Sequence, residues 1–184
     1  MDGELKVGGY SFASSPQLLP SFELGIKDSQ RNPVSRYFHR EATVGDTVTV
    51  DGGHGRCVYV PDEECDLVLV AGGIGLTPML SIARAFASSD SQYELRFLYS
   101  ASRVSGFAFH DTVSELSQDP RITVDLIETD GTSVGRREIL TRALKGGTSA
   151  AFYLCGPSGM VDDLSLKLRS EGVPTSHIRF EKWW

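Results

Sequence analysis

The feature that most constrains this chain is an apolar strand that runs directly into a glycine-rich turn. Residues 67–71 have the composition of a buried strand, Gly72-Gly73-Ile74-Gly75 follows at once, and Pro78 stands where a helix can begin, with Thr77 before it as a good N-cap. Glycines let a backbone approach a ligand closely, and a helix N-terminus attracts phosphate. We expect a phosphate-binding turn, although the glycines alone also fit an ordinary tight turn and their spacing is not G-x-G-x-x-G.

Beyond residue 66, strand-like apolar runs alternate with segments of helical spacing. The expected strands are residues 67–71, 95–99, 122–127, 151–154 and 178–183. The expected helices are residues 78–87, 106–116, 137–144 and 160–170. This alternation predicts an α/β domain with a doubly wound parallel sheet covered by helices on both faces.

The first sixty residues have a different texture. Short β-rich runs are separated by Ser-Pro, Gly-Asp and Gly-Gly turn signals. These runs are residues 9–13, 22–27, 47–50 and 57–60. We expect antiparallel sheet here and a domain boundary near Pro61-Asp62-Glu63-Glu64, which divides the chain into residues 1–62 and 63–184.

Composition excludes several function classes. The net charge is −6 and the Lys and Arg residues are scattered, so nucleic acid is not an expected partner. Cys57, Cys65 and Cys155 lack metal-ligand spacing, so no metal site is expected. No apolar run reaches the roughly eighteen residues of a membrane span, and the acidic start does not resemble a targeting signal. We expect a protein of the cytoplasm or the mitochondrial matrix.

Four segments together carry a resemblance to the ferredoxin-NADP reductase superfamily. Residues 71–80 resemble its nucleotide loop, and residues 97–101 resemble its second strand and the adenosine-side loop. Residues 153–160 resemble the turn whose Cys-Gly-Pro lies beside the nicotinamide, and residues 178–181 resemble the closing strand. The ending Phe180-Glu181-Lys182-Trp183-Trp184 is particularly similar to oxidoreductase NAD-binding domain-containing proteins.

The resemblance implies that NAD(P)H binds across these turns. The residues that match the family's nucleotide site are Gly72, Gly73, Ile74, Gly75, Leu76, Thr77, Pro78, Ser102, Arg103, Arg136, Cys155, Gly156, Pro157 and Met160. No Asp or Glu directly follows the second strand, and the family places its adenosine pocket where Ser102, Arg103, Arg136 and Arg137 fall. The sequence therefore favours NADPH slightly, with both nucleotides expected to bind, although arginines are also common on exposed loops.

The resemblance also implies FAD in the N-terminal part, within an FAD-binding type of β-barrel. Tyr10 matches the residue that stacks on the isoalloxazine, Ser11 the residue that hydrogen-bonds its N5 edge, and Ser35 the residue that meets the pyrophosphate. Gly8 stands where the family has an arginine, so one pyrophosphate contact lacks its usual residue. Lys6, Arg36 and Arg40 are candidates to replace it, and nothing in the spacing singles one out. The family's motif glycine is Asn32 or Pro33 here.

Only a few residues precede the Tyr10 strand, so we expect a partial antiparallel barrel that is incomplete at its N-terminus. Such a barrel leaves strand edges unpaired. A homo-oligomer, an alternative packing and a truncated gene model are three explanations that stay open. Two roles are equally compatible with Trp183 and Trp184: anchoring the last strand in the core, or placing a terminal aromatic ring such as Trp184 over the flavin.

These observations predict an NAD(P)H-dependent flavin oxidoreductase or reductase component, which passes electrons to a redox partner or a small-molecule acceptor. Hydride would move from nicotinamide C4 to flavin N5. The resemblance gives Thr77 and Cys155 the role of lining that meeting point and Ser11 that of stabilising charge at the flavin edge. The alternative is a flavin-free NAD(P)H-binding module that acts as a sensor or a partner subunit.

Overall fold

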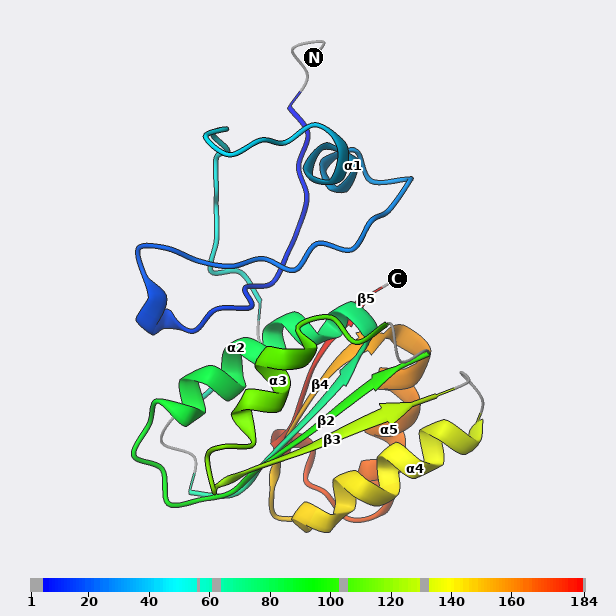
Figure 1. The fold of residues 1–184 in the computed structure, drawn as a ribbon. Coiled ribbons are helices and arrows are strands. Elements are labelled where there is room, and N and C mark those ends of the chain that lie inside the picture. Colours follow the sequence, from blue (N-terminus) through cyan, green and yellow to red (C-terminus); the bar gives the residue numbers. More distant parts are fainter. Residues whose placement is uncertain (1–4, 56, 61–63, 103–105, 130–132, 184) are drawn as a thin grey trace.

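The α/β part of the chain contains one parallel sheet (Figure 1). The computed structural model describes residues 5–55, 57–60, 64–102, 106–129 and 133–183. The strands are β1 (Leu67–Gly72), β2 (Leu95–Ala101), β3 (Ile122–Glu128), β4 (Ala151–Pro157) and β5 (Ile178–Trp183). The helices are α2 (Leu76–Ala87), α3 (His110–Leu116), α4 (Ser133–Ala143) and α5 (Ser158–Ser170). All five expected strands and all four expected helices of this part are confirmed, with shifts at their ends.

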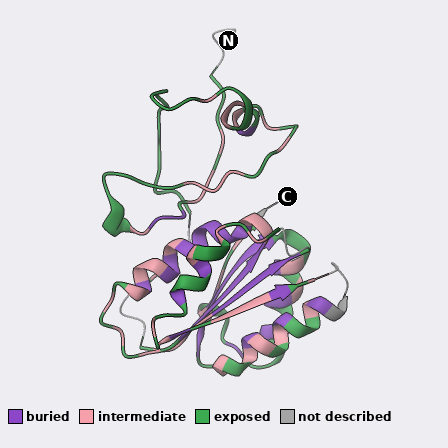
Figure 2. Cartoon of the chain, viewed as in Figure 1, coloured by how far each residue is buried: buried purple, intermediate pink, exposed green. Residues whose placement is uncertain are grey.

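Both faces of the sheet are buried, which explains why β1 is apolar without interruption. Leu67, Leu69 and Ala71 pack in the cluster that includes α2 and part of α3, whereas Val68 and Val70 pack in the cluster that includes α4 and α5. Figure 2 shows the resulting buried layer between the two helical layers. A strand buried on both faces has no polar side, so its sequence does not alternate.

The strand order β3-β2-β1-β4-β5 reverses between β1 and β4. In an open parallel sheet such a reversal leaves a crevice at the carboxyl ends of the two strands, because their following connections leave to opposite sides. The glycine turn after β1 and the Cys155-Gly156-Pro157 segment of β4 both lie at this edge. The fold therefore brings the two turns predicted for the nucleotide to one place.

The helix after β1 begins earlier than the sequence predicts. A 3-10 turn, η2 (Gly73–Gly75), winds directly into α2 at Leu76, whose N–H donates to the carbonyls of Gly73 and Ile74. Thr77 is therefore the second residue of α2 and not its N-cap, and the prediction of a threonine cap is wrong. The N-cap residue is Gly75, and Pro78 lies within the first turn of the helix, where its missing N–H costs little.

The N-terminal part differs from the expected partial barrel. Its described residues, 5–55 and 57–60, contain a 3-10 turn η1 (Pro16–Leu18) and helix α1 (Pro33–Arg40), but no strand longer than a single antiparallel bridge between Phe12 and Leu24. The β-rich runs at 47–50 and 57–60 form no ladder, and Val48, Val50 and Val58 are 50%, 51% and 61% exposed. A strand persists only when a neighbour pairs its N–H and C=O groups, and the described residues offer these runs none.

Helix α2 holds the N-terminal part against the sheet domain. Ser81 Oγ donates to the Ser14 carbonyl at 2.7 Å, and Arg84 Nη1 donates to the Ala13 carbonyl at 2.9 Å. The same guanidinium forms an ion pair with Glu23, whose carbonyl accepts from Ala13 N–H at 2.8 Å. Ala13 is fully buried in the α2 face of the core. The expected domain boundary at residue 62 stays a prediction, because residues 61–63 lie outside those that the structure describes.

None of the helices in the described part of the chain combines the length and apolar character needed to cross a bilayer.

Removing the Arg84 guanidinium should loosen this attachment without unfolding the sheet. In Arg84→Met, which keeps an apolar stem, we expect amide exchange at Ala13 to accelerate roughly 5- to 30-fold, equivalent to about 1–2 kcal/mol. Hydrogen exchange measured by NMR checks this, with β1 amides unchanged. Arg169→Met, whose guanidinium donates to the Ser165 carbonyl within α5, is the control. Equal protection of Ala13 in both variants would contradict the role given to Arg84.

Candidate functional site

The two turns at the strand reversal touch through their backbones. A Cβ on Gly75 would lie 2.7 Å from Gly156 N and still closer to the Cys155 carbonyl. A Cβ on Gly72 would lie 2.8 Å from Met160 Cε and 3.0 Å from Pro157 Cδ. The Gly75 approach is shorter than real Cβ contacts and meets backbone, so packing against β4 requires glycine at position 75, whereas the flexible end of the Met160 side chain could move away from a Cβ at position 72.

Gly73 is required for a different reason. Its φ is +55°, in the left-handed region, and a Cβ there would meet no atom within 4 Å. The conformation lets the chain turn from β1 into η2, and the space beside it is open. An open turn that leads into a helix N-terminus is the arrangement that binds a phosphate.

Thr77 and Cys155 lie in the interior beside the crevice. Thr77 is 1% exposed and its hydroxyl donates to the Ile74 carbonyl at 3.2 Å, which fixes the glycine turn onto α2. Cys155 is fully buried, and its neighbours belong to the α2 face of the core. Met160 lies beneath both turns, with Sδ 3.9 Å from Ser100 Oγ. A molecule in the crevice would therefore contact mainly the backbone of these turns.

Ser11 reaches the same edge of the sheet from the N-terminal part. Its hydroxyl donates to the Glu181 carboxylate, 3.0 Å from Oε1 and 3.2 Å from Oε2. Glu181 on β5 is the register partner of Cys155 on β4. The structure thus brings Ser11, Glu181 and the Cys155 turn together. Glu181 was not among the predicted site residues, and the only signal for it in the sequence is the resemblance of the last strand.

Two further groups near this edge are protonated at neutral pH. Burial raises the pKa of the Cys57 thiol to about 12, with a smaller contribution from the Glu181 charge, so Cys57 is not a nucleophile. Burial also raises the pKa of Tyr10. The Tyr10 hydroxyl is buried and has no hydrogen-bond partner among the described residues. A buried donor without a partner is costly, which marks this hydroxyl as a group that a ligand can satisfy.

Gly25 and Phe109 cover the glycine turn, and neither was among the predicted site residues. A Cβ on Gly25 would lie within 3.1 Å of the Phe109 ring and closer still to the Thr77 methyl group. Phe109 has a φ of 53° and precedes α3. The Tyr99 hydroxyl supports this loop by accepting from Ala108 N–H at 2.9 Å. Positive φ at a bulky residue stores strain, and such strain often occurs beside binding sites.

The residues predicted for the outer ends of the cofactors are dispersed. Ser102 is exposed at the end of β2, and Arg136 on α4 pairs with Asp163 at 3.4 Å. Ser35 is buried in α1 and hydrogen-bonds within its own segment. Arg103 and Trp184 lie outside the described residues.

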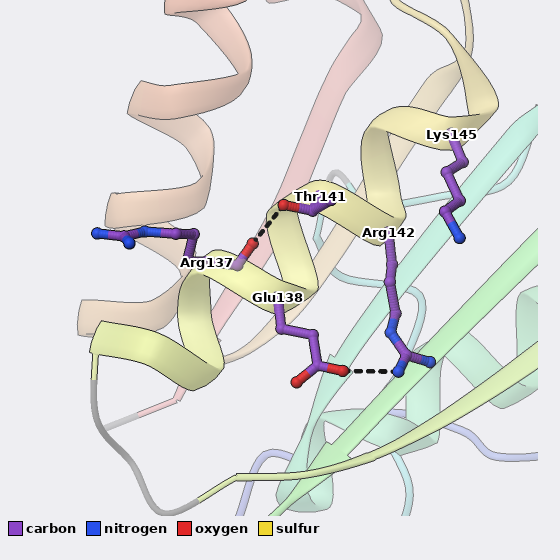
Figure 3. Close-up of a pocket in the computed structure, with 5 residues that line it drawn as sticks. All are labelled: Arg137, Glu138, Thr141, Arg142 and Lys145. Carbon is purple, nitrogen blue, oxygen red and sulfur yellow. Dashed lines mark hydrogen bonds and ion pairs between the residues drawn. The ribbon is translucent and has the colours of Figure 1, made fainter.

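A surface pocket lies on α4, away from the strand reversal (Figure 3). It is lined by Arg137, Glu138, Thr141, Arg142 and Lys145. Arg142 is already paired with Glu138 at 2.6 Å and with Asp125 at 2.9 Å. Arg137, one of the arginines expected near the adenosine, lines this pocket, but the glycine turn and the Cys155 turn do not, so we assign the functional site to the strand reversal instead.

Comparison with known proteins agrees with this assignment. The sequence model of the oxidoreductase NAD-binding domain matches residues 69–165, which include β1, the glycine turn and the Cys155 turn. The chain belongs to the oxidoreductase NAD-binding domain family. The expected resemblance to the ferredoxin-NADP reductase superfamily is confirmed, and the matched segment covers most of β1 and all of β2, β3 and β4.

The similarity between this oxidoreductase NAD-binding chain and its relatives extends beyond residues 69–165. It is 35% identical to the bovine (Bos taurus) oxidoreductase NAD-binding domain-containing protein 1, over 97% of this chain and 66% of that protein. It is 31% identical to the zebrafish (Danio rerio) protein of the same name, over 97% of this chain and 76% of that protein. The chain thus spans about two thirds of the length of the bovine relative.

Solved structures share the fold of this oxidoreductase NAD-binding chain. A cytochrome P450 reductase from Amycolatopsis superposes with a TM-score of 0.81 at 20% identity, covering 94% of this chain and 55% of that one. Phthalate dioxygenase reductase gives a TM-score of 0.76 at 23% identity, covering 94% and 52%. At these identities the likeness shows the fold alone.

Three glycine substitutions should separate packing from conformation at the turn. Gly75→Ala forces a methyl into the Cys155–Gly156 backbone, and we expect a loss of about 2–3 kcal/mol. Gly73→Ala carries only left-handed strain, about 1–2 kcal/mol. Gly159→Ala, in the first turn of α5 with open space around it, is the control and should be neutral or stabilising.

Urea unfolding measures all three variants, with an unchanged m-value as evidence that the folded state is intact. A Gly75→Ala protein as stable as Gly159→Ala would show that the two turns do not depend on their close contact.

Proposed function

We propose that this chain is an NAD(P)H-dependent flavin oxidoreductase or the reductase component of a larger system. The observation that carries the proposal is the hydrogen bond between Ser11 and Glu181. It brings the residue that resembles the family's flavin contact to the strand reversal, beside the turn that resembles its nicotinamide contact. A hydride can pass between two cofactors only when their reacting atoms lie at van der Waals distance.

The nucleotide side of the proposed site consists of backbone and small side chains. The open turn at Gly73 would hold the diphosphate at the N-terminal end of α2, where the helix dipole favours negative charge. The Cys155 turn would lie along the nicotinamide, since Gly75 fixes its backbone at the crevice. Thr77 would exclude water from the base of the site, because it is buried under Gly25.

On the flavin side, Tyr10 and Ser11 are the residues that fit a flavin. The buried Tyr10 hydroxyl is a hydrogen-bond donor without an acceptor among the described residues, and the ribityl hydroxyls of a flavin supply several acceptors. Ser11 is oriented by Glu181, so its oxygen is held at the crevice. When bound, a flavin would supply the atom that accepts hydride and would pass the electrons on to a redox partner or a small-molecule acceptor.

A second candidate function is a flavin-free NAD(P)H-binding module that acts as a sensor or partner subunit. It is favoured by the lack of barrel strands among described residues 5–55 and 57–60, and by Gly8 in place of the family's arginine. Such a module would bind the nucleotide at the same turns but would not oxidise it.

Anaerobic stopped-flow mixing of the protein with NADPH or NADH and added flavin distinguishes the two functions. The reductase should bleach the flavin absorbance, and Ser11→Ala should slow the bleaching roughly 10- to 100-fold, the cost of about 1.4–2.8 kcal/mol at the flavin edge. Ser15→Ala is the matched control, because it removes a serine hydroxyl that makes no capping hydrogen bond to η1. Nucleotide binding without any bleaching would favour the sensor.

The preference between NADPH and NADH tests the adenosine end. The Arg136 side chain is 38% exposed, and its Nε lies 3.4 Å from Asp163 Oδ2. Because a partly exposed ion pair is weak, a 2'-phosphate can compete with Asp163 for the guanidinium. We expect NADP to bind more tightly than NAD, and Arg136→Ala to reduce that preference about 5- to 30-fold. Calorimetric titration at two salt concentrations measures this, because a charge contact weakens with salt.

Arg169→Ala, near the C-terminal end of α5, is the control and should leave the preference unchanged. An identical NADP to NAD ratio in wild type and Arg136→Ala would remove Arg136 from the adenosine pocket.

A further inference from the structure

We propose, resting on the function proposed above, that this chain recognises a flavin by its isoalloxazine and ribityl end and makes no specific contact with a flavin phosphate. Riboflavin, FMN and FAD would then bind with similar affinity and exchange with solution as substrates. The proposal rests on three local observations around α1 and Gly8, where the family resemblance places the pyrophosphate.

The N-terminus of α1 has already used its backbone donors. Pro33 has no N–H, and Asn32 Oδ1 accepts from Val34 N–H at 2.9 Å and from Ser35 N–H at 3.1 Å. The next N–H, of Arg36, donates to the Asn32 carbonyl at 3.0 Å. A phosphate binds a helix N-terminus through these same N–H groups. The Asn32 carboxamide therefore occupies the position that a phosphate oxygen would need.

The Ser35 hydroxyl is also fully used. It donates its one hydrogen to the Lys27 carbonyl at 2.7 Å and accepts from Ser29 N–H at 3.0 Å. The side chain is 2% exposed, so a ligand would have to break both bonds to reach it. A hydroxyl has a single hydrogen to donate, and here that hydrogen closes the 27–29 loop onto α1.

Gly8 offers no side chain for a phosphate contact either. A Cβ at this position would lie 2.7 Å from Tyr10 Cε2 and 3.0 Å from the Tyr10 hydroxyl oxygen, so the tyrosine ring occupies the space beside Gly8. No guanidinium is available at this position for a bidentate phosphate contact. Exposed Lys27, Arg31 and Arg36 add only a weak, salt-screened attraction for any anion.

The two ends of the proposed flavin site therefore differ in a measurable way. At the ring and ribityl end, the Tyr10 hydroxyl lacks a partner among the described residues, whereas the Ser11 hydroxyl already donates its hydrogen to Glu181 and offers a ligand only its lone pairs. At the phosphate end, the backbone and hydroxyl donors of Val34, Ser35 and Arg36 are already bonded within the chain. Binding energy would come from the first end, which riboflavin, FMN and FAD share.

One catalytic cycle accounts for all electrons and protons when the flavin is a substrate that exchanges with solution. Hydride leaves C4 of NAD(P)H with both electrons and forms a bond to N5 of the oxidised flavin, and a proton from solvent completes the dihydroflavin. The nicotinamide is oxidised and the flavin reduced by two electrons. The dihydroflavin then leaves, and dioxygen in an aerobic assay reoxidises it and becomes hydrogen peroxide.

Dissociation constants for riboflavin, FMN and FAD, measured by flavin fluorescence at physiological salt, test the proposal directly. For the wild-type chain we expect the three values to agree within about threefold, about 0.65 kcal/mol. In Asn32→Gly, which costs a helix cap only a few tenths of a kcal/mol, the N–H groups of Val34 and Ser35 become free. FMN and FAD should then bind at least about fivefold more tightly than riboflavin.

Asn32→Asp, which keeps the capping oxygen, is the matched control and should show no gain for the phosphate forms. FAD binding more than about 30-fold tighter than riboflavin in the wild type would overturn the proposal while leaving the reductase function standing. An Asn32→Gly protein without phosphate preference would overturn the part played by the cap. Absence of binding for all three flavins would instead defeat the proposed function itself.

Discussion

The close contact between the Gly75 turn and the backbone of Cys155 and Gly156 is the constraint on which the site depends. It joins β1 to β4 at the point where the strand order reverses, and it leaves no room for a side chain between them. Because this contact fixes the backbone of both turns, they do not have to be ordered when a ligand binds, which lowers the entropy cost of binding.

The position of the N-terminal part depends on the sheet domain, and the sheet domain does not depend on the N-terminal part. It contributes little regular structure of its own, but α2 fixes it through Ser81 and Arg84, and β5 fixes it through Glu181. These polar contacts connect a largely exposed segment to a core that is buried on both faces of its sheet. The catalytic geometry proposed for Ser11 is therefore set by the stable half of the molecule, which can hold a reacting group in place.

Hydrogen-bond capacity distinguishes the two ends of the proposed flavin site better than residue type does. Ser35 is the residue type that the family resemblance predicts, yet its donors are used within the chain, whereas the Tyr10 hydroxyl is buried without a partner among the described residues. A buried donor is valuable to a ligand only while it is free, because an existing bond must be broken first. Resemblance in sequence cannot report this state.

The sequence by itself determined the parallel sheet and its glycine turn, since runs buried on both faces are apolar throughout and a turn at φ +55° needs glycine. Tertiary structure decided the start of α2 at Leu76, the loss of the expected barrel strands and the pairing of Ser11 with Glu181. Local periodicity reports burial along one segment, whereas Ser11 and Glu181 are 170 residues apart and meet only because β5 lies beside β4 in the sheet.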